Sequence, residues 1–441
     1  MKNFKKITAS LLALVLVFGL VACNNTDNGD QTDDPDTNVE EPGEEDNTLS
    51  VWAWDPAFNL YAMEEAEKIY KETNPNFALN IIETPWDDVQ TKLTTMASSQ
   101  QLDELPDIFL MQDNAFQKNV INFPEVFTDL TGSDIAFDEF GEAKLAFSIV
   151  DGKNYGVPFD SGTAVAAYRT DLLAEAGLSI ADYTDITWAD FVENGKLVRE
   201  ATGKSTTSAT AAPDLMMIML HSAGASLFDE EGNPHIAGNE VILEAFNVYQ
   251  DLVGEGVVLI VNDWDQYVGS IVDTTVAGVI DGAWILASVQ TAEDQSGLWE
   301  ITNVPKLEIP GGTNYSNSGG SSWAVTTSGS NPDLAIDFLS KTFADSIDLY
   351  ETILPSSGAI ATWLPAGDSD VYGVPQDFFG GQAIYAEITE YSKHVPSTNT
   401  GVYYYEARDA VGTALTNALN GADIETELQG AQETLEFLMG G

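Results

Sequence analysis

Three short apolar runs decide the fold of this chain: LSVWAW at residues 49–54, ALNII at 78–82 and IFLM at 108–111. Apolar residues at helical spacing fill the two intervals between these runs: Leu60, Met63, Ala66 and Ile69, then Val89, Leu93 and Met96. Short apolar runs that alternate with helical periodicity predict the order β-α-β-α-β. Right-handed crossovers between such strands make the sheet parallel. We therefore predict an α/β fold.

Aromatic, amide and acidic residues follow the three predicted strands. They are the pairs Trp54-Asp55, Trp86-Asp87 and Gln112-Asp113. Ligands of open α/β sheets bind outside the carboxyl ends of the strands. We therefore expect the ligand site at this edge of the sheet.

The rest of the chain predicts a second lobe. The segment YGVPFDSG at residues 155–162 leads into an apolar strand at 163–168, and the glycine-rich loop at 311–323 is long enough to be functional. We interpret residues 155–162 as a crossing between lobes, although these residues alone fit a plain hairpin equally well. The predicted domains are residues 49–159 and 305–350 for lobe 1, residues 160–304 and 351–441 for lobe 2, and a hinge near Phe159 to Gly162 and Pro305.

The N-terminus predicts export. Basic residues precede an apolar stretch at 7–21, which is shorter than the about 20 residues that a spanning helix needs, so residues 1–22 are predicted to be a signal peptide. The motif LVAC at 20–23 resembles the lipobox of bacterial lipoproteins, which implies that Cys23 is acylated, as with palmitate, and anchors the chain. The alternative is an ordinary secretory signal with a chance cysteine. Residues 23–48 are acidic and almost without apolar side chains, which predicts a disordered tether.

The charge of the chain excludes some partners. The formal net charge is −53, so nucleic acid and anionic membrane surfaces repel the protein. The carboxylates are dispersed and none has the spacing of a calcium-binding loop. We therefore favour a solvated surface suited to a saline or alkaline habitat over a role in binding cations.

Residues suited to catalysis are scarce. The chain has three histidines, at positions 221, 235 and 394, and none lies in a zinc-binding spacing. The GGSS segment at 319–322 lacks the lysine of a phosphate-binding loop. A pair of carboxylates for glycoside hydrolysis would leave no sequence signal, so that alternative stays open. We predict no catalytic residue, no cofactor and no metal site.

Aromatic residues are enriched at the predicted ligand edge. Trp54, Trp86, Trp284, Trp323 and the tyrosines at 403–405 each lie near an acidic, amide or glycine residue. The apolar C–H faces of a pyranose lie flat on aromatic rings, and its hydroxyls need carboxylates and amides. This combination favours a carbohydrate ligand, although core packing explains Trp54, Trp86 and Trp323 equally well. The other tryptophans that we assign to the core are Trp52, Trp188 and Trp299.

The chain as a whole resembles the extracellular solute-binding lipoproteins of ABC importers, in the sugar-binding branch typified by maltose-binding protein. The motifs that support this resemblance are YGVPFDSG (155–162), YRTDLL (168–173), DGAW (281–284), GGSSW (319–323), YYEA (404–407) and LNG (419–421). The resemblance implies a two-lobe periplasmic-binding-protein-like fold that closes about a hinge on an oligosaccharide. It also implies that Asp113 binds a sugar hydroxyl, that Trp284 stacks on a sugar ring, and that Tyr404 or Tyr405 adds an aromatic face.

These observations predict a receptor, not an enzyme, that captures a carbohydrate and delivers it to ABC permease subunits. The predicted ligand-binding residues are Trp54, Asp55, Trp86, Asp87, Asp113, Asp160, Ser161, Trp284, Gly320, Ser321, Trp323, Tyr404, Tyr405 and Glu406. Two alternatives stay open: the same fold could bind a peptide, polyamine or metal chelate, or the chain could be a surface glycoside hydrolase. We expect a monomer at the extracellular face of the cell membrane, held there by the lipid on Cys23.

Overall fold

The computed structural model describes residues 47–398 and 400–440, which belong to one compact unit, Asp46–Gly441. The predicted signal peptide, Cys23 and all but the last two residues of the acidic tether lie outside the described residues. Within the described part of the chain, no helix is both long and apolar enough to cross a membrane.

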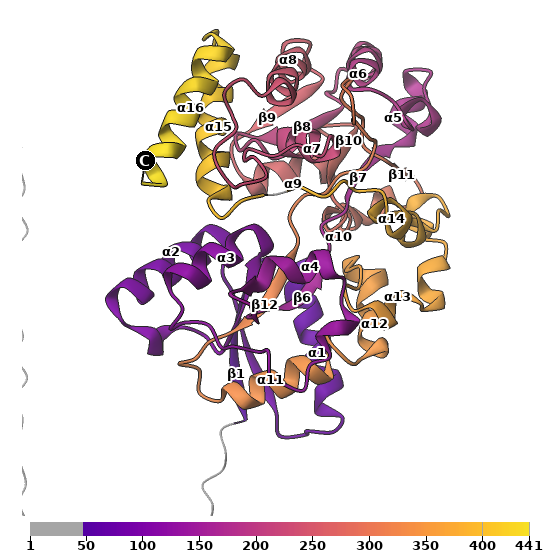
Figure 1. Cartoon of the computed structure of the whole chain (residues 1–441). Coiled ribbons are helices and arrows are strands. Elements are labelled where there is room, and N and C mark those ends of the chain that lie inside the picture. The colour runs from indigo at the N-terminus through magenta and orange to yellow at the C-terminus, as the bar shows by residue number, and fades with distance from the viewer. Residues whose placement is uncertain (1–46, 399, 441) are drawn as a thin grey trace, which may run out of the picture. The chain divides into compact units, whose positions relative to one another are not determined.

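A five-stranded sheet forms the first lobe, with the strand order β2-β1-β3-β12-β6. Figure 1 labels β1, β6 and β12 of this sheet among the helices of the first lobe. Its strands are β1 (Thr48–Ala53), β2 (Ala78–Glu83), β3 (Ile108–Gln112), β6 (Val157–Asp160) and β12 (Ser321–Val325). β1 pairs in parallel with β2 and with β3, so the predicted β-α-β-α-β unit is confirmed. β12 is antiparallel to both β3 and β6, which makes the sheet mixed.

Helices cover both faces of this sheet. The side chains of β1 alternate between the two faces, and apolar side chains on each face need a helix to bury them. Val51 faces a core shared with α1, α11 and α12, whereas Trp52 faces a core shared with α2 and α3. The helices of this lobe are α1 (Tyr61–Lys71), α2 (Trp86–Ser99), α3 (Asp113–Asn122), α4 (Glu142–Leu145), α11 (Pro332–Lys341), α12 (Ile347–Ser357) and α13 (Leu364–Gly367). A short hairpin of β4 (Ile149–Val150) and β5 (Lys153–Asn154) precedes β6.

The second lobe contains an antiparallel sheet in the order β10-β7-β11 and a parallel pair, β8 and β9. Its strands are β7 (Ala164–Arg169), β8 (Thr207–Thr210), β9 (Val258–Val261), β10 (Gly278–Gly282) and β11 (Trp299–Thr302). The side chains of β7 also alternate between two cores, one with Tyr168 and one with Val165.

The helices of the second lobe pack against these two cores. They are α5 (Thr170–Glu175), α6 (Trp188–Thr202), α7 (Asp214–Ser222), α8 (Glu240–Gly254), α9 (Trp264–Val272), α10 (Ile285–Gln290), α14 (Ile384–Ser392), α15 (Tyr404–Leu419) and α16 (Ile424–Leu438). Trp52, Trp188 and Trp299 are buried, as predicted.

Two adjacent segments connect the lobes. Residues 161–163 join β6 of the first sheet to β7 of the second, so the plain-hairpin alternative for this segment is wrong. The second segment runs from β11 to β12, and the Ser318 amide donates to the Gly162 carbonyl at 2.7 Å. Gly162 has φ +63°, and a Cβ there would lie 2.6 Å from the Gly319 carbonyl carbon. Only glycine therefore lets the two connections pack this closely.

Residues that follow position 350 contribute to the core of the first lobe. Ile353, Ala359 and Trp363 pack in the same cluster as Val51. The sequence assigns residues 351–441 to the second lobe, and the lobe boundaries stay a prediction.

Candidate ligand-binding site

A cavity of about 210 Å³ lies between residues of the two lobes. Its aromatic lining is Trp86, Trp264, Tyr267, Trp284, Tyr404 and Tyr405. Its charged and amide lining is Asp87, Gln112, Asn114, Asp214, Asp281, Asn317 and Arg408. Five of the predicted ligand-binding residues are therefore brought together here: Trp86, Asp87, Trp284, Tyr404 and Tyr405.

Trp86 forms one aromatic wall of the cavity. It is the first residue of α2 and follows Pro85, whose extended backbone ends the preceding turn. Its ring lies 5.4 Å from that of Trp54 and 6.1 Å from that of Tyr405. Trp54 therefore supports the wall from behind and is not itself part of the cavity lining.

Trp284 and Trp264 form a second aromatic wall. The Trp284 indole donates from Nε1 to the Ser318 carbonyl at 3.0 Å, which fixes the plane of the ring. A Cβ at Gly282 would lie 2.1 Å from that Nε1, so the glycine of the DGAW motif makes room for the ring. The Trp264 ring lies 5.7 Å from Trp284, and this residue is 42% exposed. Sequence reasoning missed Trp264, although its place at a helix start after the capping residue Asp263 resembles that of Trp86.

Asp281, which the list of ligand-binding residues also omitted, places a buried carboxylate at the cavity. It accepts hydrogen bonds from Tyr267 Oη at 2.9 Å, from Ser318 Oγ at 2.9 Å and from the Gly282 amide at 2.8 Å. Burial, against the Gly282 hydrogen bond and with the nearby charge of Asp214, raises the pKa of Asp281 to about 7. The sequence signal that could have identified Asp281 is its position near the end of β10, directly before a glycine.

Arg408 is a cation of the cavity lining and is already paired. Its Nε lies 2.9 Å from Asp214 Oδ1, and its guanidinium lies 5.5 Å from the Tyr405 ring centroid. Three carboxylates thus line the cavity with this one guanidinium. The site offers many acceptors for hydroxyl groups and no free positive charge among the residues that line it.

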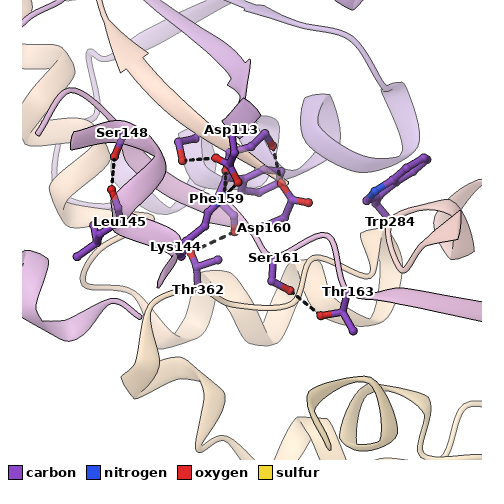
Figure 2. A network of polar contacts seen from close by, with 12 residues as sticks. Asp113, Lys144, Leu145, Ser148, Phe159, Asp160, Ser161, Thr163, Trp284 and Thr362 are labelled. Atoms are coloured by element: carbon purple, nitrogen blue, oxygen red, sulfur yellow. Dashed lines mark hydrogen bonds and ion pairs between the residues drawn. The ribbon is translucent and has the colours of Figure 1, made fainter. Parts of the chain in front are cut away.

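Asp113 lies in a separate polar network beneath the end of the first sheet, and Trp284 stands apart from it (Figure 2). Asp113 is 4% exposed, forms an ion pair with Lys144 and accepts from Ser322 Oγ at 3.0 Å. Burial raises its pKa to about 6, although Lys144 opposes that shift. Lys144 also donates to the Ser321 carbonyl at 2.8 Å, so the network joins β3 to β12.

Other predicted site residues belong to the same network or lie beside it. Asp160 is buried and accepts from Ser321 Oγ. Gly320 has φ +105°, and a Cβ there would lie 2.6 Å from Asp113 Oδ2. The Ser161 hydroxyl lies 3.2 Å from that of Thr163, in the connection between the lobes. None of these predicted residues is part of the cavity lining.

The remaining predicted residues have other contacts. Asp55 caps a helical turn by accepting from the amides of Ala57 and Phe58 at 2.9 and 3.0 Å. Glu406 pairs with Lys118. The prediction that Trp323 contacts the ligand is wrong, because its side chain is fully buried in the core of the first lobe, with its ring 5.4 Å from that of Phe159.

In residues 47–398 and 400–440, no group of three or more His, Cys, Asp or Glu side chains is arranged to hold a metal ion. The aromatic walls and the acceptor-rich lining are instead features of a site for an organic solute.

This fold and this cavity define the class of the protein, which is that of two-lobe α/β receptors for solutes. Residues 65–348 match the family model described as bacterial extracellular solute-binding protein. The chain is 36% identical to the lactose-binding protein of Rhizobium radiobacter over 386 residues, which cover 87% of this chain and 91% of that one. The chain belongs to the family of bacterial extracellular solute-binding proteins.

Solved structures show the same fold at low sequence identity. The GacH receptor of Streptomyces glaucescens GLA.O, solved unliganded and with acarbose, has a TM-score of 0.77 at 15% identity, over 89% of this chain and 98% of that chain. The ABC transporter associated binding protein of B. animalis subsp. lactis Bl-04, solved with β-1,6-galactobiose, has a TM-score of 0.75 at 20% identity, over 88% and 96% of the two chains.

Proposed function

We propose that this protein is the carbohydrate-capturing receptor of an ABC importer and that its ligand is a neutral galactoside of two or a few sugar rings. The observation that carries this proposal is the cavity itself, in which the aromatic walls of Trp86 and Trp284 enclose carboxylates and amides. Pyranose faces stack on such rings and pyranose hydroxyls donate to such oxygens. The similarity to a lactose-binding protein supports a galactoside as the ligand.

The charge of the lining supports an uncharged ligand. Asp87 and Asp214 repel an anionic group, and Arg408 is already paired with Asp214. Uronic acids and sugar phosphates should therefore bind more weakly than neutral sugars, since each would bury a like charge without a partner.

In this proposal, ligand binding is coupled to lobe closure. A solute that touches Trp86 on one lobe and Trp284 on the other favours the arrangement in which both contacts are made. The closed receptor then presents its sugar to the permease in the membrane. We further propose that the chain acts as a monomer, anchored at the extracellular face of the membrane by the lipid on Cys23, and that it performs no catalysis.

A thermal-shift screen of the purified protein tests the proposal. Lactose, β-1,6-galactobiose, galacturonic acid, spermidine and a tripeptide should be compared at one salt concentration. A ligand that binds only the folded state adds about 2.7 kcal/mol to its stability at 100 times Kd. We expect lactose or galactobiose to raise the Tm and galacturonic acid to leave it unchanged. A shift with spermidine or the peptide alone would reject the carbohydrate, and cleavage of a labelled galactoside would reject the receptor in favour of a hydrolase.

A further inference from the structure

One ion pair joins helices from different lobes close to the cavity. Lys118 on α3 pairs with Glu406 on α15, and the lysine Nζ also lies 5.4 Å from the Tyr403 ring centroid. The two side chains are 29% and 23% exposed, so water screens the pair only in part. This partial burial lowers the pKa of Lys118.

A hydrogen bond in the cavity wall lies beside this ion pair. Tyr405 Oη donates to Gln112 Oε1, and both residues line the cavity. Gln112 directly precedes α3, and Tyr405 is the neighbour of Glu406 on α15. A force that draws α3 toward α15 therefore also sets the distance between Gln112 and Tyr405.

Both lobes are acidic, so they repel each other wherever no cation intervenes. The chain has 70 acidic and 17 basic residues. Lys118 places one of these few cations against a carboxylate of the other lobe. The second carboxylate oxygen of Glu406 is buried and accepts no hydrogen bond from any described residue. The negative charge of this carboxylate is therefore offset by Lys118. Removal of Lys118 would leave a partly buried charge unpaired, which favours separation of α3 from α15.

We infer that Lys118 and Glu406 are positioning residues for ligand binding: their ion pair holds α3 against α15 and sets Gln112 and Tyr405 in the cavity wall. This inference rests on the proposed function, because it concerns the same cavity. Neither side chain is part of the cavity lining.

Charge reversal tests the inference, with lactose as the probe and calorimetry as the measurement. We expect K118E and E406K each to weaken lactose binding by about tenfold, since each replaces a partly desolvated attraction by a repulsion. The double variant K118E/E406K restores the opposite charges and should recover most of the affinity.

The matched control is Lys196, which pairs with Glu193 on the surface of α6 at 2.8 Å. K196E changes the net charge as K118E does, and it should leave lactose affinity unchanged. Equal losses in K118E and K196E would overturn the inference, because the effect would then be one of net charge. Unchanged affinity in both single reversals of the cross-lobe pair would overturn it as well.

A second measurement separates this inference from the proposed function. Spin labels at T94C on α2 and E425C on α16, both exposed positions, report the distance between the lobes in a C23S background without any sugar. We expect K118E to shift this distribution to longer distances and the double reversal to return it. If lactose fails to bind, the proposed function fails while this distance still decides the role of the pair. An unchanged distribution in K118E would overturn the inference.

Discussion

Each lobe places an aspartate and a tryptophan on or next to the strands of its sheet, and the two pairs have opposite fates. In the first lobe Asp113 and Trp323 are buried, one in an ion pair and the other among aromatic rings. In the second lobe Asp281 and Trp284 line the cavity. Position on or next to a strand therefore selects candidates for a binding site, but the packing of neighbouring elements decides which of them a ligand can reach.

The largest expected effect is on the buried ion pair of the first lobe. Lys144→Met leaves Asp113 buried beside Asp160 without its cation, and loss of one partner of a buried pair costs about 3–5 kcal/mol. Urea unfolding of the variant measures this change. The double variant Asp113→Asn, Lys144→Met removes both charges and should recover part of the loss. A single variant as stable as the wild type would show that the pair does not hold the sheet together.

Trp323→Ala should cost nearly as much, and again in stability. Its ring fills the core beside Phe159 and Phe343, and truncation of a buried aromatic residue to alanine costs about 3–5 kcal/mol. The free energy of unfolding measures this loss. Sugar affinity, measured where the variant is still folded, should change little. A loss of affinity with normal stability would return Trp323 to the binding site.

Trp284→Ala should show the reverse pattern. The loss of a stacking face should weaken lactose binding by about 1–3 kcal/mol, while the Tm of the free protein changes little because the ring is only partly buried. Calorimetry of the variant measures the affinity. Trp264→Ala is the companion variant, since its ring contacts Trp284 and the cavity. Wild-type affinity in Trp284→Ala would remove this residue from the site.

The smallest stepwise effect, at most about 1.4 kcal/mol for each pH unit, is a pH dependence of stability at Asp281. Its folded pKa of about 7 lies above the ordinary value of an aspartate, so the folded protein holds a proton that the unfolded chain has released. Stability is therefore lost as the pH rises from about 4 to 7, by at most about 1.4 kcal/mol per pH unit for one proton. Asp281→Asn should flatten this part of the stability profile. Parallel profiles for variant and wild type would show that Asp281 does not titrate there.

Sequence patterns were sufficient for local structure. Apolar periodicity identified β1, α1, β2, α2 and β3. The antiparallel pairing of β12 with β3 was harder to foresee, because β3 lies some two hundred residues earlier in the chain. The same is true of Lys144, whose neighbours in sequence give no sign that it meets Asp113.

The sequence by itself determined the α/β class and the aromatic and acidic character of the site, because these follow from periodicity and residue chemistry within short windows. Only the tertiary structure decided that Trp284 and Trp264 face the cavity while Trp323 is buried, and that Lys118 meets Glu406. Exposure and long-range pairing depend on which distant elements pack together. That packing is a property of the whole chain, so no local pattern encodes it.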